Sequence, residues 1–581
     1  MQRKSNLNLL GVFSIIIALF FALSTFFPVG IVAFADSQVK EITVFSWEDY
    51  IDEGYESAAE EASDVLLDRF SEEDLEMSVI DVFERENPNI KVNYYSFATN
   101  EEMYNELLKD PDAVDLICPS EYMILKMRDE GLIKPYTIPQ NYAEYGSPYI
   151  KGVFDELGLN TSDGTAYATG YMWGTMGLIY NAEKFTDEDF ESWSNLFDEK
   201  FSGKITIKDS LRDSYIMAIA IVYKDELLQL KTALNDGTIL DYNADGKTDA
   251  EDYEARLFEI FNRTDEQTVD KVGAALIELK SNLYGFEVDA GKNDLLTGKI
   301  DVNFAWSGDA VYSMWEADES GLELRYVVPE EGSNVWFDGW VMTKDADEES
   351  SLKFLDFMAR PDVAIRNMDY VGYTSCIGGD EVFSYVYDNF SEEYLPEATL
   401  TSSGFEELSD EEKAEYVAFD GGYALKDDGY ARIIEDNGIY LKYFTLDENG
   451  NEVETERAEA YANDLKYFFQ PQDTSGNYII HTTETCRHLY AQYADEQTIL
   501  RCAVMDNFSV EDLELVNEMW NKVKLITLSD TVLIIIVSVI AVAILGFVLL
   551  KFKDKLFANK VPQGDVKPRK DGRKIIKVEE I

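Results

Sequence analysis

Short apolar runs alternate with helix-spaced segments through the first two thirds of the chain. Branched and aromatic residues at 42–45, and alternating apolar positions at 90–97, are typical of strands. Between such runs, apolar residues recur at about every third or fourth position, which indicates helices. The predicted strands are 42–45, 90–97, 114–118, 204–207 and 300–306, and the predicted helices are 79–86, 101–108, 124–130 and 510–524. This alternation predicts an α/β fold with a mostly parallel, doubly wound sheet.

The start of the chain has the pattern of a secretory signal. Arg3 and Lys4 precede a long uncharged apolar stretch at 9–32, and Ala33-Phe34-Ala35 matches a small-x-small cleavage site. Because the apolar stretch is long for a signal, an uncleaved anchor is the alternative. We therefore expect residues 1–35 to be a signal peptide or an N-terminal anchor.

A second long apolar stretch lies near the other end. Residues 531–550 carry no charge and are long enough to cross a bilayer as a helix. The segment that follows is rich in Lys and Arg, so the positive-inside rule places it in the cytoplasm. We expect a transmembrane helix at 529–551, a basic cytoplasmic tail at 552–581, and an extracellular ectodomain held at the cell membrane.

Aromatic and acidic residues gather just past several predicted strands. Rings stand beside carboxylates or hydroxyls at Trp47 to Tyr50, Ser120 to Tyr122, 306–309 and 336–340, and residues 208–213 supply carboxylates and a hydroxyl. Ligands of open α/β sheets bind at the carboxyl ends of strands. Ring faces attract ammonium groups and carboxylates pair with them. Singly, each cluster also fits a strand followed by a polar turn, with Trp47 in the core; together they predict one cation-binding cleft.

Charge and composition narrow the function further. The formal net charge is −62, which argues against nucleic acid as a partner and would steer cations inward. With 46% hydrophobic residues, the chain can bury a large core. Four cysteines are too few for a disulfide framework, and two histidines leave little for general-base or zinc chemistry.

One loop has the oxygen spacing of a calcium site, with Gly246 at its sharp turn. Its candidate ligands are Asp241, Asn243, Asp245, Lys247, Asp249 and Asp252. Such an ion would be structural and would stiffen a helical insertion; no cofactor is expected for function. The alternative is a polar loop that binds nothing.

The clusters resemble the spermidine/putrescine-binding proteins of bacterial ABC importers. The likeness covers about 42–376, interrupted by insertions at about 52–78 and 225–262. Pro119 to Tyr122 is similar to the family's Pro-Ser-Thr-Tyr, and Trp336 to Asp338 to its Trp-Met-Asp. Residues 209–213, 305–308 and 372–373 resemble its Asp-Asp-x-Arg-Glu, Trp-Asn-Gly and Gly-Tyr motifs.

This resemblance implies a ligand site. Rings would surround the methylenes of a polyamine, Asp213 and Asp338 would hold its ammonium groups, and Ser120 would add a hydrogen bond. The rings are Trp47, Tyr50, Tyr122, Trp306, Trp336 and Tyr373. The sequence departs from the family pattern at Ser210, Asp213 and Glu48, which moves or removes charge and leaves the preferred polyamine open.

The resemblance also implies a two-lobed periplasmic-binding-protein type II-like fold that closes by a hinge motion and docks on a membrane permease. Lobe 1 would hold residues 36–168 and 338–376, and lobe 2 residues 169–337 and 377–525 with their insertions. The Gly-punctuated aromatic run at 167–180 is expected to cross between the lobes, and residues 444–453 to form a hairpin.

Three functions therefore stay open. The first is a membrane-anchored receptor that delivers a polyamine to an ABC permease. The second is a sensor or surface binding protein without transport, because a fold does not settle function. The third is a carbohydrate-active enzyme, since rings and paired carboxylates also suit glycoside hydrolysis.

Overall fold

The computed structural model describes residues 39–391 apart from 244 and 245, short stretches between 405 and 459, and residues 461–525 apart from 470–477 and 483. The predicted signal or anchor at 1–35, transmembrane helix at 529–551 and tail at 552–581 lie outside these residues. Among the described helices, none combines the length and apolar character needed to span a bilayer. The chain divides into two units, Met1–Met519 and Trp520–Ile581, and the sheet described below belongs to the first.

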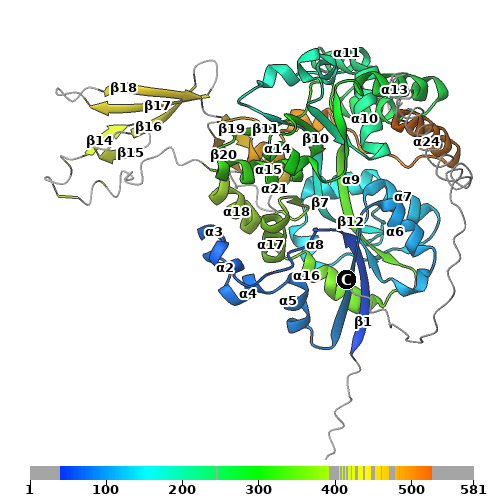
Figure 1. Cartoon of the computed structure of the whole chain (residues 1–581). Helices are drawn as coiled ribbons and strands as arrows, with labels where there is room; N and C mark the ends of the chain where they lie inside the picture. Colours follow the sequence, from blue (N-terminus) through cyan, green and yellow to red (C-terminus); the bar gives the residue numbers. More distant parts are fainter. Residues whose placement is uncertain are drawn as a thin grey trace, which may run out of the picture. The chain divides into compact units, whose positions relative to one another are not determined.

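One 11-stranded sheet organises this unit, with the main order β2-β1-β3-β12-β7-β10-β8-β9 (Figure 1). Its strands are β1 (Lys40–Trp47), β2 (Ile90–Phe97), β3 (Leu116–Ile117), β4 (Ile133–Lys134), β7 (Ala168–Asn181), β8 (Ile205–Lys208), β9 (Leu283–Glu287), β10 (Val302–Trp306), β11 (Leu324–Val327), β12 (Val335–Thr343) and β13 (Thr374–Ser375). The predicted α/β class is confirmed. The prediction of a mostly parallel sheet is wrong, because β7 and β12 pair antiparallel with each other and with several neighbours.

Strand β7 connects the two halves of this sheet. Its first part pairs with β12, from Val335 opposite Thr175 to Val341 opposite Ala168. Its last part pairs with β10 and β11. All 14 residues of β7 are buried. The crossing expected at 167–180 is thus observed, while the exact lobe boundaries stay a prediction.

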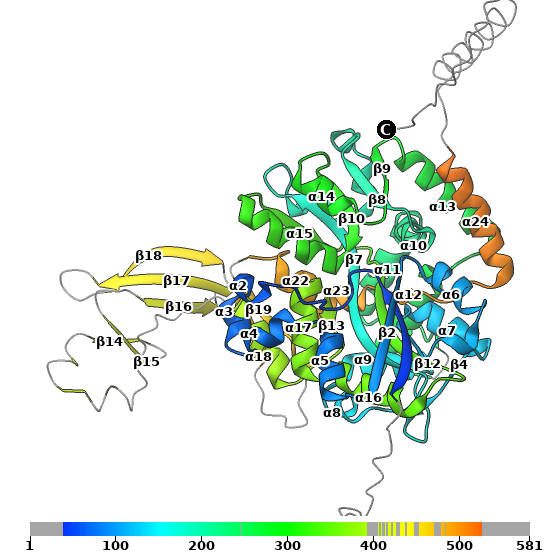
Figure 2. The same ribbon diagram turned by 60° about the horizontal axis from the view of Figure 1, so that its bottom comes forward.

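Helices cover the half that contains β1, β2, β3 and β12. Contacts with these strands are made by α5, α6, α7 and α16 (Figure 2). The helices of this part are α2 (Ala58–Glu61), α3 (Asp64–Leu67), α4 (Glu72–Glu76), α5 (Val79–Glu86), α6 (Asn100–Leu107), α7 (Glu121–Asp129), α8 (Gln140–Tyr145), α9 (Pro148–Glu156), α16 (Glu348–Met358), α17 (Pro361–Val371) and α18 (Asp380–Phe390). A small hairpin pairs β5 (Tyr136–Thr137) with β6 (Thr165–Ala166).

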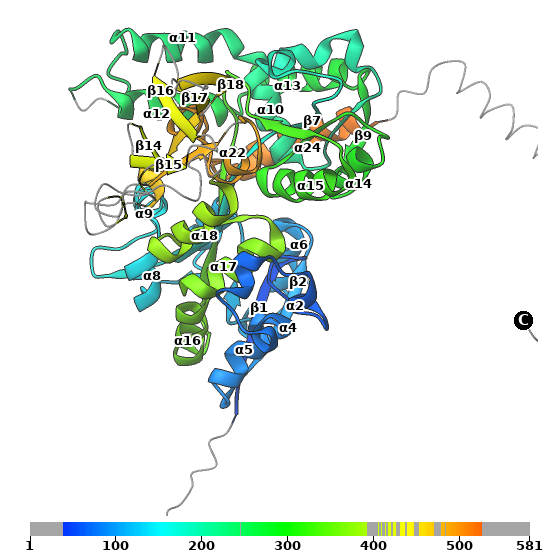
Figure 3. The same ribbon diagram turned by 90° about the vertical axis from the view of Figure 1, so that its left-hand side faces the viewer.

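The half with β8, β9 and β10 has its own helices, which Figure 3 shows on the same side of the molecule as β9. Helix α10 contacts β8, and α15 contacts β7, β10 and β11. These helices are α10 (Leu211–Val222), α11 (Lys224–Asn235), α12 (Ala250–Phe261), α13 (Glu266–Leu279), α14 (Gly291–Leu296) and α15 (Ser307–Ser320). Short 3-10 turns follow β7 at η2 (Asp187–Phe190), η3 (Trp193–Phe197) and η4 (Glu199–Phe201), and another precedes β3 at η1 (Pro111–Ala113).

The C-terminal part of the first unit packs back onto β7. The ring of Trp173 stacks on Phe337 of β12 at 6.3 Å and on Phe468 of α21 at 5.5 Å. Its elements are β19 (Tyr461–Asp464), α21 (Lys466–Phe469), β20 (Ile479–Thr482), α22 (His488–Gln492), α23 (Glu496–Leu500) and the first part of α24 (Val510–Lys524), which continues into the second unit. The preceding strands are β14 (Tyr416–Phe419), β15 (Gly422–Leu425), β16 (Tyr430–Glu435), β17 (Ile439–Leu446) and β18 (Glu452–Glu459); β17 and β18 form the predicted hairpin.

Local sequence explains where the helices near the predicted site begin. The side chain of Ser78 accepts a hydrogen bond from the N–H of Asp81 at the start of α5, and Thr99 caps α6 in the same way. Ser210 caps α10 by accepting from the N–H of Asp213. Helix α17 ends at Gly372, whose φ of 74° suits glycine and turns the chain into Tyr373. The caps thus set the positions of Asp213 and Tyr373.

Candidate functional site

Three predicted site rings pack against one another. The ring of Tyr373 lies 5.5 Å from Tyr50 and 5.6 Å from Trp336, both nearly edge to face. We call Tyr50, Trp336 and Tyr373 the ring box. The three come from the turn after β1, from β12 and from the turn after α17. Gly308 allows this packing, because a Cβ there would lie 2.3 Å from the ring of Tyr373.

Asp338 lies against the ring box and is 5% exposed. Its Oδ2 accepts a hydrogen bond of 2.7 Å from the Tyr50 hydroxyl. Its Oδ1 is buried and has no hydrogen-bond partner within the part of the chain that is described. Burial raises the pKa of Asp338 to about 7, even though the Tyr50 and Ser120 hydroxyls favour its charged form.

Ser120 lies beside this carboxylate. Ser120 and Asp338 form an isolated antiparallel bridge between the start of α7 and β12. The Ser120 hydroxyl accepts a hydrogen bond of 3.1 Å from Asn100, which also donates to the Tyr122 hydroxyl at 2.9 Å. The bridge and the shared donor bring the predicted residues Ser120, Tyr122 and Asp338 together.

The next residue, Glu121, is not among the predicted site residues, although it lies within the Pro119 to Tyr122 motif. Its side chain is fully buried and accepts a hydrogen bond of 3.0 Å from the N–H of Phe337. Burial raises the pKa of Glu121 to about 8, so its carboxyl group is largely neutral at neutral pH.

Asp213 lies in the first turn of α10 and is 6% exposed. Burial raises its pKa to about 6, while the Ser210 hydroxyl and the charges of Lys208 and Arg212 counteract part of that rise. The charge of Asp213 also raises the pKa of Asp338, although burial is the larger cause.

Two further predicted rings are covered by cations of the protein. The guanidinium of Arg212 lies 3.8 Å from the ring centroid of Tyr122. The ammonium of Lys208 lies 4.1 Å from the ring centroid of Trp306. Both cations belong to the 208–213 motif, where the sequence pattern indicated only a polar turn.

Trp47 is the last residue of β1, so the strand ends two residues later than predicted. Its ring packs on Phe97 at 4.8 Å. A cavity of about 350 Å³ lies at this end of β1. It is lined by Trp47, Glu48, Asp49, Tyr50, Ile51, Glu53, Tyr94 and Ser96. Rings and carboxylates therefore share a cavity next to the ring box.

Two residues outside the predicted set complete the cluster. Tyr171 of β7 packs edge to face on Tyr50 at 5.4 Å and donates to its backbone oxygen. Asp309 accepts a hydrogen bond of 2.9 Å from the Tyr373 hydroxyl and one of 3.0 Å from Lys208. Asp309 belongs to the noted 306–309 cluster, whereas Tyr171 reaches the site through the pairing of β7. The ligand-binding role of all these residues stays a prediction.

The candidate calcium loop connects α11 and α12. Asp252 is fully buried, and its carboxylate accepts hydrogen bonds from the N–H groups of Tyr242, Asn243 and Asp249 at 2.6, 3.0 and 3.1 Å. Asp245 lies outside the described residues. Within the described part of the chain, no group of three or more His, Cys, Asp or Glu could hold a metal ion. The calcium site stays a prediction from spacing.

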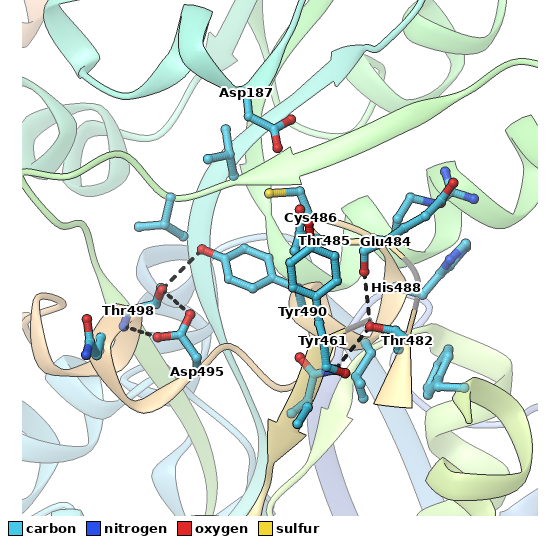
Figure 4. Close-up of a pocket in the computed structure, with 18 of the residues that line it drawn as sticks. Asp187, Tyr461, Thr482, Glu484, Thr485, Cys486, His488, Tyr490, Asp495 and Thr498 are labelled. Carbon is cyan, nitrogen blue, oxygen red and sulfur yellow. Dashed lines mark hydrogen bonds and ion pairs between the residues drawn. The ribbon is translucent and has the colours of Figure 1, made fainter. Parts of the chain in front are cut away.

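A second cavity, of about 910 Å³, shares no residue with the predicted site. Tyr461, Cys486, Tyr490 and Asp495 of the C-terminal segment line it (Figure 4), and the Tyr490 hydroxyl lies 3.2 Å from that of Thr498. The four cysteines are all unpaired. The C-terminal segment, for which the sequence indicates no role, thus lines a cavity together with earlier residues such as Asp187 and Asp318.

A comparison with protein families shows the family of the chain. The model for bacterial extracellular solute-binding proteins matches residues 78–378, just over half of the chain. The chain belongs to this family. Its members bind solutes and are not enzymes, so the carbohydrate-active enzyme is set aside.

Individual relatives agree with the resemblance seen in the short motifs, which is thereby confirmed. The spermidine/putrescine-binding periplasmic protein of Escherichia coli (strain K12) is 24% identical over 333 residues, 57% of this chain and 75% of the relative. The putrescine-binding periplasmic protein SpuD of Pseudomonas aeruginosa (strain UCBPP-PA14) is 25% identical over 358 residues, 59% and 80% of the two chains.

Among solved structures, PotD of Streptococcus pneumoniae, a spermidine/putrescine ABC transporter substrate-binding protein in complex with calcium and HEPES, is similar at 20% identity and a TM-score of 0.45. The similarity covers 84% of this chain and 98% of PotD.

Proposed function

We propose that this chain is an extracellular receptor for a small cationic amine of the polyamine class, held at the bacterial cell membrane, that delivers its ligand to an ABC importer permease. The named ligands of its relatives support the amine, and the aromatic and acidic residues around Asp338 support a cation. The ligand would be bound by Trp47, Tyr50, Ser120, Tyr122, Asp213, Trp306, Trp336, Asp338 and Tyr373.

One observation carries this proposal: Asp338 is a buried carboxylate with an unused oxygen beside the ring box. Among the described residues, its hydrogen bond comes from the neutral Tyr50 hydroxyl and no cation pairs with it. Burying a carboxylate without a counter-charge is costly, and its pKa is raised accordingly. A ligand ammonium would supply the missing charge, and the rings would bury its methylenes and face its cation.

Membrane attachment and transport rest on other parts of the sequence. The apolar stretch at 529–551 is proposed as the anchor and 552–581 as its cytoplasmic tail, with 1–35 as signal or second anchor. Two lobes, 36–168 with 338–376 and 169–337 with 377–525, are proposed to close on the ligand. The loop 241–252 is proposed to hold a structural calcium ion because of its oxygen spacing.

Calorimetric titration of the full-length protein tests the binding function. We expect one-to-one binding of at least one among putrescine, spermidine, spermine and their singly acetylated forms. Asp338→Asn should weaken that binding about 10- to 100-fold, the range of a hydrogen bond to a charged group.

Asp369→Asn provides the matched control. Asp369 is also a largely buried carboxylate with a pKa raised by burial to about 6, but it bonds to Tyr385, away from the site. Its substitution should leave the affinity unchanged. Equal affinity of the Asp338→Asn variant and the wild type would remove Asp338 from the site, and no binding of any amine would refute the function.

A sensor without a transport role is the remaining alternative. Amine uptake by cells that lack this protein and by cells that regain it would separate the two, since a sensor restores no uptake.

A further inference from the structure

Lys208 places an ammonium group of the protein inside the predicted amine site. It is the last residue of β8 and is 1% exposed. Its Nζ lies 3.0 Å from Oδ2 of Asp309, 3.3 Å from Oε1 of Glu287 and 2.7 Å from the backbone oxygen of Val288. With the Trp306 ring at 4.1 Å, it has the surroundings expected of a bound ammonium: carboxylates, a carbonyl and a ring face.

Asp309 links this ammonium to the ring box. Asp309 bridges the two, because one of its oxygens binds Lys208 and the other accepts from the Tyr373 hydroxyl at 2.9 Å. Tyr373 in turn packs on Tyr50, whose hydroxyl binds Asp338. The lysine therefore lies at one end of the same cluster that has Asp338 at the other end.

The two ends differ in their charge balance. At the Lys208 end, Asp309 is paired with both Lys208 and Lys292, the latter at 3.6 Å. Burial alone would raise the pKa of Asp309, but these two cations outweigh it and the pKa is lowered. Arg212 covers Tyr122 in the same region. At the other end, no cationic side chain in the described chain forms an ion pair with Asp338.

We propose that the ammonium of Lys208 takes the place of one ammonium group of the ligand, so that this site selects an amine with a single positive charge. A polyamine whose second nitrogen is acylated has this chemistry. The inference rests on the proposed function and narrows its ligand class. A ligand ammonium would bind Asp338 within the ring box, while an uncharged end would face Trp306 and Lys208.

Like-charge repulsion is the physical basis of this selectivity. A diamine that places one ammonium at Asp338 would bring the second towards Lys208 in a buried site, where charges interact more strongly than in water. Asp309 and Glu287 do not offset this second charge, because Lys208 and Lys292 already balance their two negative charges.

Titration of the full-length protein with putrescine and 4-amino-1-butanol tests the proposal, because these ligands differ only in the charge at one end. The wild type should bind 4-amino-1-butanol at least as tightly as putrescine. In Lys208→Met, the second ammonium of putrescine can bind Asp309 and Glu287, so the preference should move towards putrescine by about tenfold or more. Lys204→Met, at a half-exposed lysine paired with Asp301, should keep the wild-type preference.

Each outcome has a definite meaning. A wild type that binds putrescine about tenfold more tightly than 4-amino-1-butanol overturns the inference, even if Lys208→Met does not fold. An unchanged preference in a folded Lys208→Met protein also overturns it. A wild type that binds no amine at all refutes the proposed function instead, so the two failures are distinguishable.

Discussion

Three buried carboxyl groups around the candidate site have raised pKa values. Asp338, Glu121 and Asp213 reach about 7, 8 and 6, and in each case burial is the largest cause. Asp213 has Lys208 and Arg212 nearby, and Glu121 is neutral at neutral pH. Asp338 and Glu121 each have an oxygen without a hydrogen-bond partner among the described residues, and Asp338, with the lower pKa, is the more readily ionised of the two. Asp338 is therefore the position in the site at which a bound cation is stabilised most.

The pKa of Asp338 predicts a pH-dependent affinity. A proton and a ligand ammonium compete for the same carboxylate, and in the free protein the proton half occupies it near pH 7. Affinity should therefore fall as the pH drops below about 7, approaching tenfold per pH unit. Titration between about pH 8 and pH 5 measures this fall.

Asp369→Asn again serves as the control, since Asp369 titrates in the same range, with a pKa of about 6, outside the site. That variant should keep the wild-type pH profile. An affinity that stays constant over the whole range would show that Asp338 does not bind the ammonium.

At this scale the sequence predicted the type of site better than its charges. The clusters of rings and carboxylates indicated Tyr50, Trp336 and Asp338, and the family resemblance added Tyr373; the structure brings these four into contact. The position of Lys208 was not predictable, because a lysine at a strand end normally points to solvent. Its burial depends on Asp309 and Glu287, which lie far away in the sequence.

At the scale of elements, local patterns were reliable where they were complete. The strand Ile90–Phe97 and the helix Val79–Glu86 have the predicted bounds, because alternation and capping lie within each segment. Whether paired strands run parallel or antiparallel was not predictable in this way. The antiparallel pairing of β12 with β7 joins residues more than 150 positions apart, and no local pattern encodes it.

The loop between α11 and α12 allows a test at this scale. If its oxygens bind calcium, chelation should lower the melting temperature by a few degrees, because a ligand that binds only the folded state stabilises it. Differential scanning calorimetry with and without chelator measures the effect. Asp241→Asn should abolish the chelator response, whereas Asp236→Asn, just outside the loop, should keep it.

An unchanged melting temperature in chelator would contradict the calcium prediction. The loop would then be held by its own hydrogen bonds, which include those from the N–H groups of Tyr242, Asn243 and Asp249 to Asp252 and from the N–H of Gly246 to Asp241.

For the whole molecule, the dominant property is negative charge. The chain carries 112 acidic and 50 basic residues. Such a surface attracts cations and raises their rate of arrival at a cleft. The same charge opposes compact folding through self-repulsion. Buried carboxyls with raised pKa values also lower the stability of the folded state as the pH rises, because the folded state holds their protons more tightly than the unfolded chain does.

The raised pKa values and the negative net charge predict that the ligand-free protein becomes more stable as the pH is lowered from about 8 to about 5. The sign follows from linkage: a carboxyl whose folded pKa is raised costs stability once the pH exceeds its unfolded pKa, and the cost grows until the pH passes the folded value. For Glu121 that window ends at about 8, and for Asp338 at about 7.

Glu121→Gln keeps an acceptor for the N–H of Phe337 but carries no charge. It should raise the melting temperature at about pH 8 by several degrees and flatten its pH dependence, whereas Glu102→Gln, at an exposed position, should change neither. A melting temperature that rises with pH over this range would show that the buried carboxyls of the folded protein are ionised without cost.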